Sequence, residues 1–466
     1  MLEPSNTVKW LVFLLIWGVA GVFLHLIVRH RGLLMGFTMF AALSFGLTNL
    51  SEFLVTKLLL LDDSYVTSAH LVVYFYTLGG LLAFAAGVWW AWSPLRAGAR
   101  LENPFAARPV LTWVFLAAGF FFTFASPLLI RIPTAGAVLG RMPALTMLGA
   151  LAALTRAVHT GDRSQLLIAF GGFVAFGLLH TILSGFSGYL GAILLPALLI
   201  LLFSRRPALP HVIFFAAGLV LYFLLATGWL ETRSLIRNQE LEAETPVARA
   251  VEFSGKFATT ISGVLSTEKV VEAVRVRIDL SKYNVSQVEW MPEGEPYAYG
   301  RSLFLDPMLA LVPRTLWPEK PFIMGDTEFV NRFTGRAHSG ETISIDTNLT
   351  FELYANFGWI GVVLGLGVFG WIIARLELAL FRPGNPLKQV VLLSMVLLTL
   401  WTGGRRAAAL AMEIGASAIG AYVIGKILDI LAHNTSLRFD QAGNTPASRR
   451  RAPGYARQAR LARRKE

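Results

Sequence analysis

Residues 165–204 read QLLIAFGGFVAFGLLHTILSGFSGYLGAILLPALLILLFS and contain no Asp, Glu, Lys or Arg. A helix that crosses the hydrocarbon core of a bilayer needs about 20 consecutive apolar residues, so this stretch is long enough for two spans. The small and polar residues at 184–188, SGFSG, supply a turn near its middle. The stretch therefore predicts a helical hairpin inside a membrane.

The composition of the whole chain also indicates a membrane protein. Its 466 residues are 55% hydrophobic and only 15% charged, whereas a soluble globular protein carries about 25% charged residues. The absence of cysteine excludes disulfides, thiolate nucleophiles and thiolate metal sites. Much of the net charge of +12 lies in the tail after His433. A basic tail after a last span is typical of the cytoplasmic side and an anionic leaflet, so we do not expect nucleic-acid binding.

Apolar runs predict an all-α, polytopic integral membrane protein with about eleven transmembrane helices. The expected spans lie near 8–28, 32–51, 69–92, 110–130, 133–154, 165–183, 186–203, 211–230, 351–373, 388–402 and 407–428. The first run is too long for a signal-peptide core, so we expect it to be retained. The predicted parts are an N-terminal bundle (1–230), a long loop (231–350), C-terminal helices (351–432) and a basic tail (433–466).

The short loops predict the orientation. Arginines gather in alternate loops, near residues 29–31, 96–108, 156–163, 205–206 and 375–382, and in the tail. By the positive-inside rule these loops face the cytoplasm. The N-terminus is then outside, the C-terminus is cytoplasmic, and the loop 231–350 is external.

The long external loop is expected to be functional, because a connector of this length is unusual. Apolar residues recur at helical spacing in its first half, from Val247 to Ile278. Six prolines interrupt its second half, which is therefore predicted to be mostly irregular. Within it, residues 312–321 read VPRTLWPEKP and place Arg314 and Lys320 in a proline-stiffened segment near the bilayer surface. Such a segment suits an anionic, lipid-bound substrate.

Four arginines fall at the external ends of predicted spans, against the positive-inside trend: Arg131, Arg141, Arg405 and Arg406. A charge at the centre of a membrane helix costs at least about 2.5–3.5 kcal/mol, so such residues tend to be paired or functional. Arg405 and Arg406 follow a glycine pair that permits close approach, and we expect both to face the bundle interior under the loop. A plain alternative is an internal ion pair, for which Glu413 is a candidate.

No soluble-enzyme motif and no metal-ligand spacing occurs among the histidines, so no metal site is expected. The second half of the loop instead carries a mixed charged set. Arginine binds phosphate oxygens in a forked geometry, and a carboxylate or histidine beside it can take a proton from a sugar hydroxyl. The competing interpretation is ordinary surface ion pairing. The set comprises Arg301, Arg314, Lys320, Arg332, Arg336 and His338 with Asp306, Glu319, Asp326, Glu328, Glu341 and Asp346.

Two segments resemble a known family. Residues 300–302, GRS, followed by 312–321, are similar to the PR-x-LWP-x-KP segment of Wzy-type oligosaccharide repeat-unit polymerases. Residues 351–361, FELYANFGWIG, resemble the E-x-Y-x-NFG-x-x-G opening of the following span in that family, and 275–280 is similar to its upstream arginine-containing stretch. The likeness covers about 290–365. The chain departs from the family in its odd number of spans and in lacking a clear second arginine-rich external loop.

The resemblance implies a multi-pass enzyme of the bacterial inner membrane that polymerises oligosaccharide repeat units carried on polyprenyl diphosphate. The growing chain would leave its carrier and join the non-reducing end of a new unit, with inversion and with no cofactor, nucleotide sugar or metal. Expected partners are the lipid-linked oligosaccharide, the bilayer, and flippase and chain-length regulator proteins. The catalytic residues would be Arg314 and Glu352. The substrate-binding residues would be Arg301, Trp317, Lys320, Arg336, His338, Asn356, Arg405 and Arg406, with Asn356 also ordering the junction between loop and span.

Two other functions fit the sequence. An O-antigen ligase shares the chemistry but transfers finished glycan to another acceptor. The second alternative is a non-enzymatic lipid-glycan transport subunit. Proteins of that class typically have short loops, and charged residues along many of their spans. The charge-free stretch 165–204 and the long loop disfavour it.

Overall fold

The computed structural model describes residues 67–92, 109–129, 142–160, 162–184, 281–312, 316–321, 323–336, 348–381 and 406–408. It also describes scattered helical residues at 11–50, 213–260 and 411–430. The description of the fold and the site rests on these residues. The predicted spans near 8–28, 32–51, 186–203, 211–230, 388–402 and 407–428 lie wholly or largely outside them.

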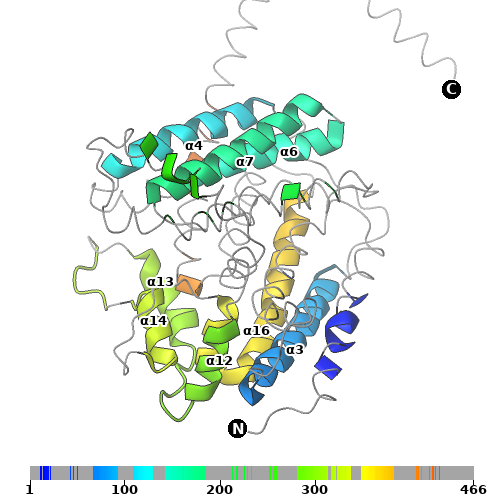
Figure 1. The fold of residues 1–466 in the computed structure, drawn as a ribbon, viewed down its shortest axis with the longest axis vertical. Helices are drawn as coiled ribbons and strands as arrows, with labels where there is room; N and C mark the ends of the chain where they lie inside the picture. The colour runs from blue at the N-terminus through cyan, green and yellow to red at the C-terminus, as the bar shows by residue number, and fades with distance from the viewer. Residues whose placement is uncertain are drawn as a thin grey trace, which may run out of the picture.

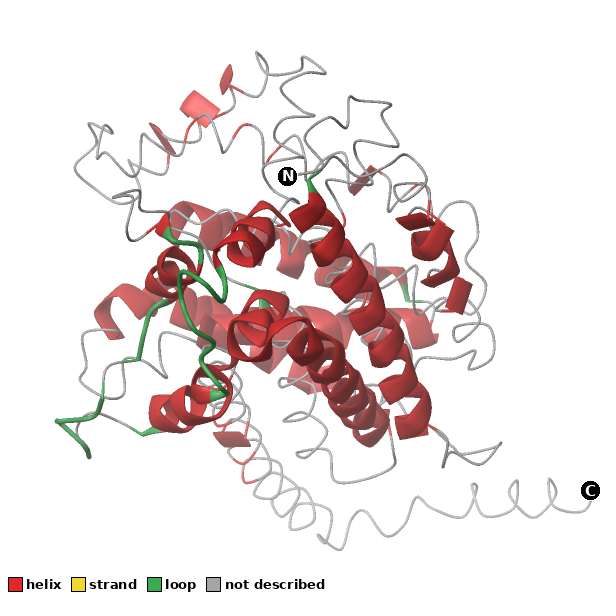
Figure 2. Cartoon of the chain, turned by 90° about the horizontal axis from the view of Figure 1, so that it is seen from below, coloured by secondary structure: helices red, strands yellow, loops and turns green. Residues whose placement is uncertain are grey.

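Every regular element among the described residues is helical, and Figure 2 shows no strand there. The α-helices are α3 (Ser68–Trp92), α4 (Pro109–Leu129), α6 (Leu145–Thr160), α7 (Arg163–Ser184), α12 (Ser281–Trp290), α13 (Asp306–Leu311), α14 (Asp326–Phe333) and α16 (Leu349–Phe381). A 3₁₀ turn, η2 (Met142–Ala144), precedes α6, and a π-helical turn, η4 (Arg301–Leu305), precedes α13. The all-α class predicted from the sequence is confirmed for this part of the chain.

The helices α3 and α16 pack against each other along their length and run in the same direction. Gly80 faces Leu366, Phe84 contacts Gly370, and the ring of Trp90 lies 6.4 Å from that of Trp371. Small residues let two backbones approach closely, a packing mode common between membrane helices. The predicted topology requires these two helices to be parallel, and they are.

The backbones of α3 and α16 approach each other closely at Gly87. A Cβ at Gly87 would overlap the carbonyl oxygen of Gly367, a backbone atom that no side-chain rotation can move. We expect Gly87→Ala to separate the helices and to destabilise the protein by about 1–3 kcal/mol, as overpacking typically does. Thermal unfolding in detergent measures this effect. The matched control is Gly79→Ala on the same helix, where the added atom would meet only a side-chain methyl group of Val363, at 3.3 Å. Equal unfolding temperatures for both variants would contradict the packing argument.

The helix α16 breaks near its start. Phe357 and Gly358 have non-helical dihedral angles, and Gly358 has φ 64° and ψ −156°. Beyond the break the chain folds back on itself, because the side chain of Leu353 lies against Gly365 and its carbonyl oxygen against Gly361. The sequence predicted a span at 351–373, and the structure places this break inside it. A short helix through Asn356 precedes a longer one that continues to Phe381.

The helices α4, α6 and α7 form a second group, in which α6 packs against the other two. In Figure 1 they lie at the opposite end from α12, α13 and α14, and they run across the direction of α16. Their bounds agree with the predicted spans 110–130 and 165–183. The span predicted at 133–154 differs, because α6 begins at Leu145 and continues to Thr160. The hydropathy prediction ended the span just before the polar residues Thr155 and Arg156, but the helix continues through them.

Two of the described helices are long and apolar enough to cross a membrane: Ser68–Trp92 and Leu349–Ala379. The apolar stretches of α4, α6 and α7 are shorter. This supports a membrane protein in outline, while the number of eleven spans remains a prediction.

The second half of the predicted loop is more helical than expected. It contains η4, α13 and α14 as well as the end of α12. Pro307 lies in the first turn of α13, where a missing backbone N–H costs nothing. This proline therefore starts a helix rather than preventing one. Residues 316–321 are irregular as predicted, with a turn closed by the Lys320 N–H on the Trp317 carbonyl.

Candidate functional site

The broken start of α16 holds the loop in place through Asn356. Its side-chain carbonyl accepts a hydrogen bond from the Gly300 N–H at 2.8 Å, and its amide donates to the Ser302 hydroxyl at 2.7 Å. The Ala298 N–H donates to the Ala355 carbonyl at 2.9 Å. These bonds join segments more than fifty residues apart. The expected ordering of the junction by Asn356 is present in the structure, while substrate binding by this residue remains a prediction.

The glycines and aromatic residues of the 351–361 segment serve the same junction. Gly358 adopts a backbone conformation that glycine tolerates best, and a Cβ there would lie 3.0 Å from the Tyr297 hydroxyl. The ring of Tyr354 lies between Tyr76 of α3 and Tyr297 of the loop, at 5.4 and 6.4 Å. Residues 351–361 thus form a turn against which the loop packs.

A buried arginine lies beneath the loop. Arg406 is only 1% exposed, and its guanidinium is 3.9 Å from the centre of the Phe329 ring. It donates to the Met324 carbonyl at 2.7 Å and to Asp306 at 3.4 Å, and it lies 3.7 Å from Asp326. These partners all belong to the loop. The predicted position of Arg406 under the loop is therefore confirmed, while Arg405 and Glu413 lie outside the described residues.

Glu352 is the third carboxylate around this arginine. It is fully buried, its Oε1 is 3.6 Å from Arg406 Nε, and its Oε2 accepts a 2.6 Å hydrogen bond from the Ala407 N–H. Glu352 Oε1 accepts no hydrogen bond from the part of the chain that the structure describes. We call Asp306, Asp326, Glu352 and Arg406 the buried charge cluster. It joins the loop, the start of α16 and the segment 406–408.

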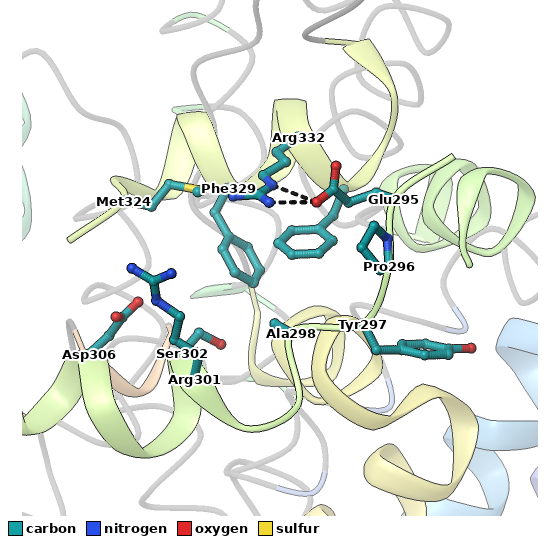
Figure 3. A pocket seen from close by; sticks show the side chains of 11 residues that line it. Glu295, Pro296, Tyr297, Ala298, Arg301, Ser302, Asp306, Met324, Phe329 and Arg332 are labelled. Atoms are coloured by element: carbon teal, nitrogen blue, oxygen red, sulfur yellow. Dashed lines mark hydrogen bonds and ion pairs between the residues drawn. The ribbon is translucent and has the colours of Figure 1, made fainter. Parts of the chain in front are cut away.

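A pocket of about 490 Å³ opens beside the cluster (Figure 3). This volume is within the range of small-molecule sites. Its walls mix aromatic and charged side chains, and Arg332 and Glu295 form an ion pair at its rim, 2.6 Å apart. It is lined by Glu295, Pro296, Tyr297, Ala298, Arg301, Ser302, Asp306, Met324, Phe329, Arg332 and Phe333.

Arg301 and Asp306 are the opposite charges inside the pocket. In Figure 3 the Arg301 guanidinium lies beside the Asp306 carboxylate, and Arg301 is an exposed residue. Burial raises the pKa of the Asp306 carboxyl, and the charges of Arg406 and Arg301 partly oppose that rise. A carboxyl with a raised pKa next to an exposed cation is suited to exchange a proton with a bound hydroxyl.

The predicted site residues divide into three groups. Arg301 lines the pocket, and Glu352, Asn356 and Arg406 lie directly behind its wall. Trp317, Lys320 and Arg336 do not line it. Arg314, His338 and Arg405 lie outside the described residues.

Two of the cations away from the pocket have structural contacts. Lys320 donates its ammonium to the Leu309 and Val312 carbonyls, both at 2.9 Å, at the end of α13. The Arg336 guanidinium lies 5.9 Å from the centre of the Tyr283 ring. Trp317 is 42% exposed.

Sequence comparison places the chain in a family. The sequence profile of DUF8712, described as a domain of unknown function, matches residues 37–430. The chain belongs to the DUF8712 family. No curated protein and no solved structure matches this DUF8712 protein significantly. The family match includes α3, the loop, α16 and the segment of Arg406, so every residue of the buried charge cluster belongs to the DUF8712 region.

Sequence reasoning did not single out Asp306 and Asp326 of this DUF8712 protein. They were part of a mixed charged set of twelve residues, and nothing in their spacing distinguished them. One signal was available for Asp306. It is the only charged residue between Leu303 and Leu311, within an otherwise apolar run. An isolated charge in such a run is expected to have a buried partner.

Proposed function

We propose that this protein polymerises oligosaccharide repeat units carried on polyprenyl diphosphate, at the outer face of the bacterial inner membrane. A hydroxyl oxygen of the incoming unit would attack the anomeric carbon of the growing chain. The bond from that carbon to the diphosphate would break, and its electron pair would leave with the carrier diphosphate. The hydroxyl proton would pass to a carboxylate.

One observation carries the proposal. Residues 300–302 and 352–361, separated in sequence but both part of the resemblance to Wzy-type polymerases, meet through the hydrogen bonds of Asn356. Arg301 and Ser302 line a pocket that Asp306 also lines, and Asn356 lies directly behind Ser302. A shared site explains why these two motif segments meet directly beside one pocket.

The pocket suits a sugar flanked by negative charge. Tyr297, Phe329 and Phe333 offer aromatic surface for a sugar ring, and Arg301 offers a cation for a phosphate oxygen. Among the described residues, two carboxylates line the pocket, and Glu295 is paired with Arg332, whereas Asp306 lies beside Arg301. Glu352 is buried behind the pocket. We therefore assign proton transfer to Asp306 and the positioning of Arg406 to Glu352. Arg314, in the proline-rich segment, would hold the diphosphate.

The predicted topology completes the proposal. With about eleven spans, an external N-terminus and a cytoplasmic tail, the loop and its pocket would face the side on which lipid-linked units are joined. The exposed aromatic residues Trp89 and Trp90 at the far end of α3 support a span that ends at a second interface.

The test is the glycan profile of a deletion strain, with and without the gene restored. We expect single repeat units to accumulate without the gene and polymer to return with it. Arg314→Lys should lose most polymer at normal membrane levels, because lysine cannot reproduce a forked phosphate contact. Loss of one such contact typically lowers a rate by about 10²–10³.

Three outcomes would redirect the proposal. Long glycan that is never attached to an acceptor would indicate a ligase. An unchanged profile in the deletion strain would refute both enzymes. Near-normal polymer from Arg314→Ala at normal expression would remove Arg314 from the mechanism.

A further inference from the structure

The segment formed by η4 and α13 carries large apolar side chains on its outside. Phe304, Leu305, Met308 and Leu311 are 66%, 48%, 70% and 58% exposed. Positions 304, 305, 308 and 311 fall on one face of a helix. Four large apolar groups therefore form a continuous exposed stripe on the loop.

The opposite face of this segment is buried and partly polar. Ser302 and Asp306 face inward together with Leu309, and Asp306 reaches the buried charge cluster. A helix on the surface of a soluble protein has the reverse arrangement, with polar groups in water and apolar groups inside. An inverted pattern is expected where the surroundings of the protein are apolar.

The exposed stripe continues onto α16. The rings of Phe304 and Phe357 meet at Gly300, where a Cβ would lie 3.0 and 3.1 Å from them. Phe357 is 42% exposed, and exposed apolar residues follow along the candidate span: Trp359, Ile360, Leu364 and Val368. The loop surface and the outer surface of the span are thus one apolar strip.

The backbone at the end of α13 is also prepared for apolar surroundings. A helix leaves its last carbonyls without internal partners, and in lipid these cannot turn to water. Lys320 donates to the Leu309 and Val312 carbonyls, and the Val312 N–H donates to Leu309. The same turn brings the exposed Leu316 and Trp317 next to the end of α13. Tryptophan is enriched where membrane meets water.

We propose that η4 and α13 insert into the bilayer, with Phe304, Leu305, Met308 and Leu311 among the lipid acyl chains beside the start of α16. The occupant of the stripe is therefore membrane lipid, and the pocket lies at the level of the interface. This inference requires α16 to lie in a membrane, but it does not depend on polymerase activity.

The experiment uses the absence of cysteine from the chain. Single cysteines are introduced in the full-length protein at Met308, Leu364 and Glu293, labelled with an environment-sensitive fluorophore, and reconstituted into phosphatidylethanolamine–phosphatidylglycerol vesicles. Leu364→Cys is the lipid-facing control on α16, and Glu293→Cys is the control on an exposed polar turn of the loop. Leu311→Cys is a second test position if the Met308 variant folds poorly.

We expect the Met308 label to emit at shorter wavelength than the Glu293 label. Lipids with a quencher on the acyl chain should reduce its emission about as strongly as they do at Leu364, and aqueous iodide should have little effect. Iodide quenching equal to that at Glu293 would overturn the proposal. A short-wavelength emission that acyl-chain quenchers leave unchanged would also overturn it, because a protein surface would then cover the stripe.

Discussion

Arg406→Ala is expected to release the loop from the helices. The substitution removes a cation that lies 3.4–3.7 Å from each of the three carboxylates of the buried charge cluster. It also removes the hydrogen bond to the Met324 carbonyl and the contact with the Phe329 ring. Removing one partner from a buried ion pair typically costs about 3–5 kcal/mol, because the remaining charge is left uncompensated.

The measurements are thermal unfolding in detergent and limited proteolysis across residues 281–336. We expect a lower unfolding temperature and faster cleavage of the loop. The matched control is Arg332→Ala, which breaks the Glu295 pair at the pocket rim. Its guanidinium side chain is 47% exposed, so the loss should be at most about 1 kcal/mol.

A second variant separates charge from packing. Adding Glu352→Gln to Arg406→Ala removes one uncompensated carboxylate and should restore part of the stability. The assignment of Arg406 as the anchor of the loop fails if the single variant unfolds and is cleaved like the parent protein.

Gly358→Ala is expected to disrupt the turn at the start of α16. The φ of 64° and ψ of −156° lie in a region that is almost restricted to glycine, and forcing another residue into it costs about 1–3 kcal/mol. The added Cβ would also lie 3.0 Å from the Tyr297 hydroxyl. We expect lower thermal stability and a loosened loop.

The matched control is Gly171→Ala in α7, where an added Cβ meets no atom within 4 Å. Alanine in a helix interior is favoured over glycine by about 0.8–1.0 kcal/mol, so this variant should be neutral or more stable. Combining Gly358→Ala with Tyr297→Phe should recover only the part of the loss that is due to the hydroxyl contact. If Gly358→Ala is as stable as Gly171→Ala, the turn does not depend on glycine.

The fold class and several helix bounds could be predicted because they depend on local composition. The runs that became α3, α4 and α7 are mostly apolar, so their ends differ from prediction by one or two residues. The bounds of α6 differ from the predicted span, and the break in α16 was not predicted, for a different reason. A hydropathy pattern is insensitive to backbone angles, and residues 351–361 are equally apolar whether the helix continues or folds back.

The candidate site, like the fold, was predicted only in part. The sequence alone predicted that Arg406 lies at the external end of a span, against the positive-inside trend, and therefore needs a partner or a function. Only the tertiary structure decided that its partners are Asp306, Asp326 and Glu352, which are 54 to 100 residues away. It also decided that Lys320 closes a helix end, while Asp306 reaches the pocket. The physical reason is that a buried arginine needs a counter-charge, which the local sequence already indicates. Which carboxylates lie beside it depends on the turn at Gly358 and the hydrogen bonds of Asn356, which bring distant segments together.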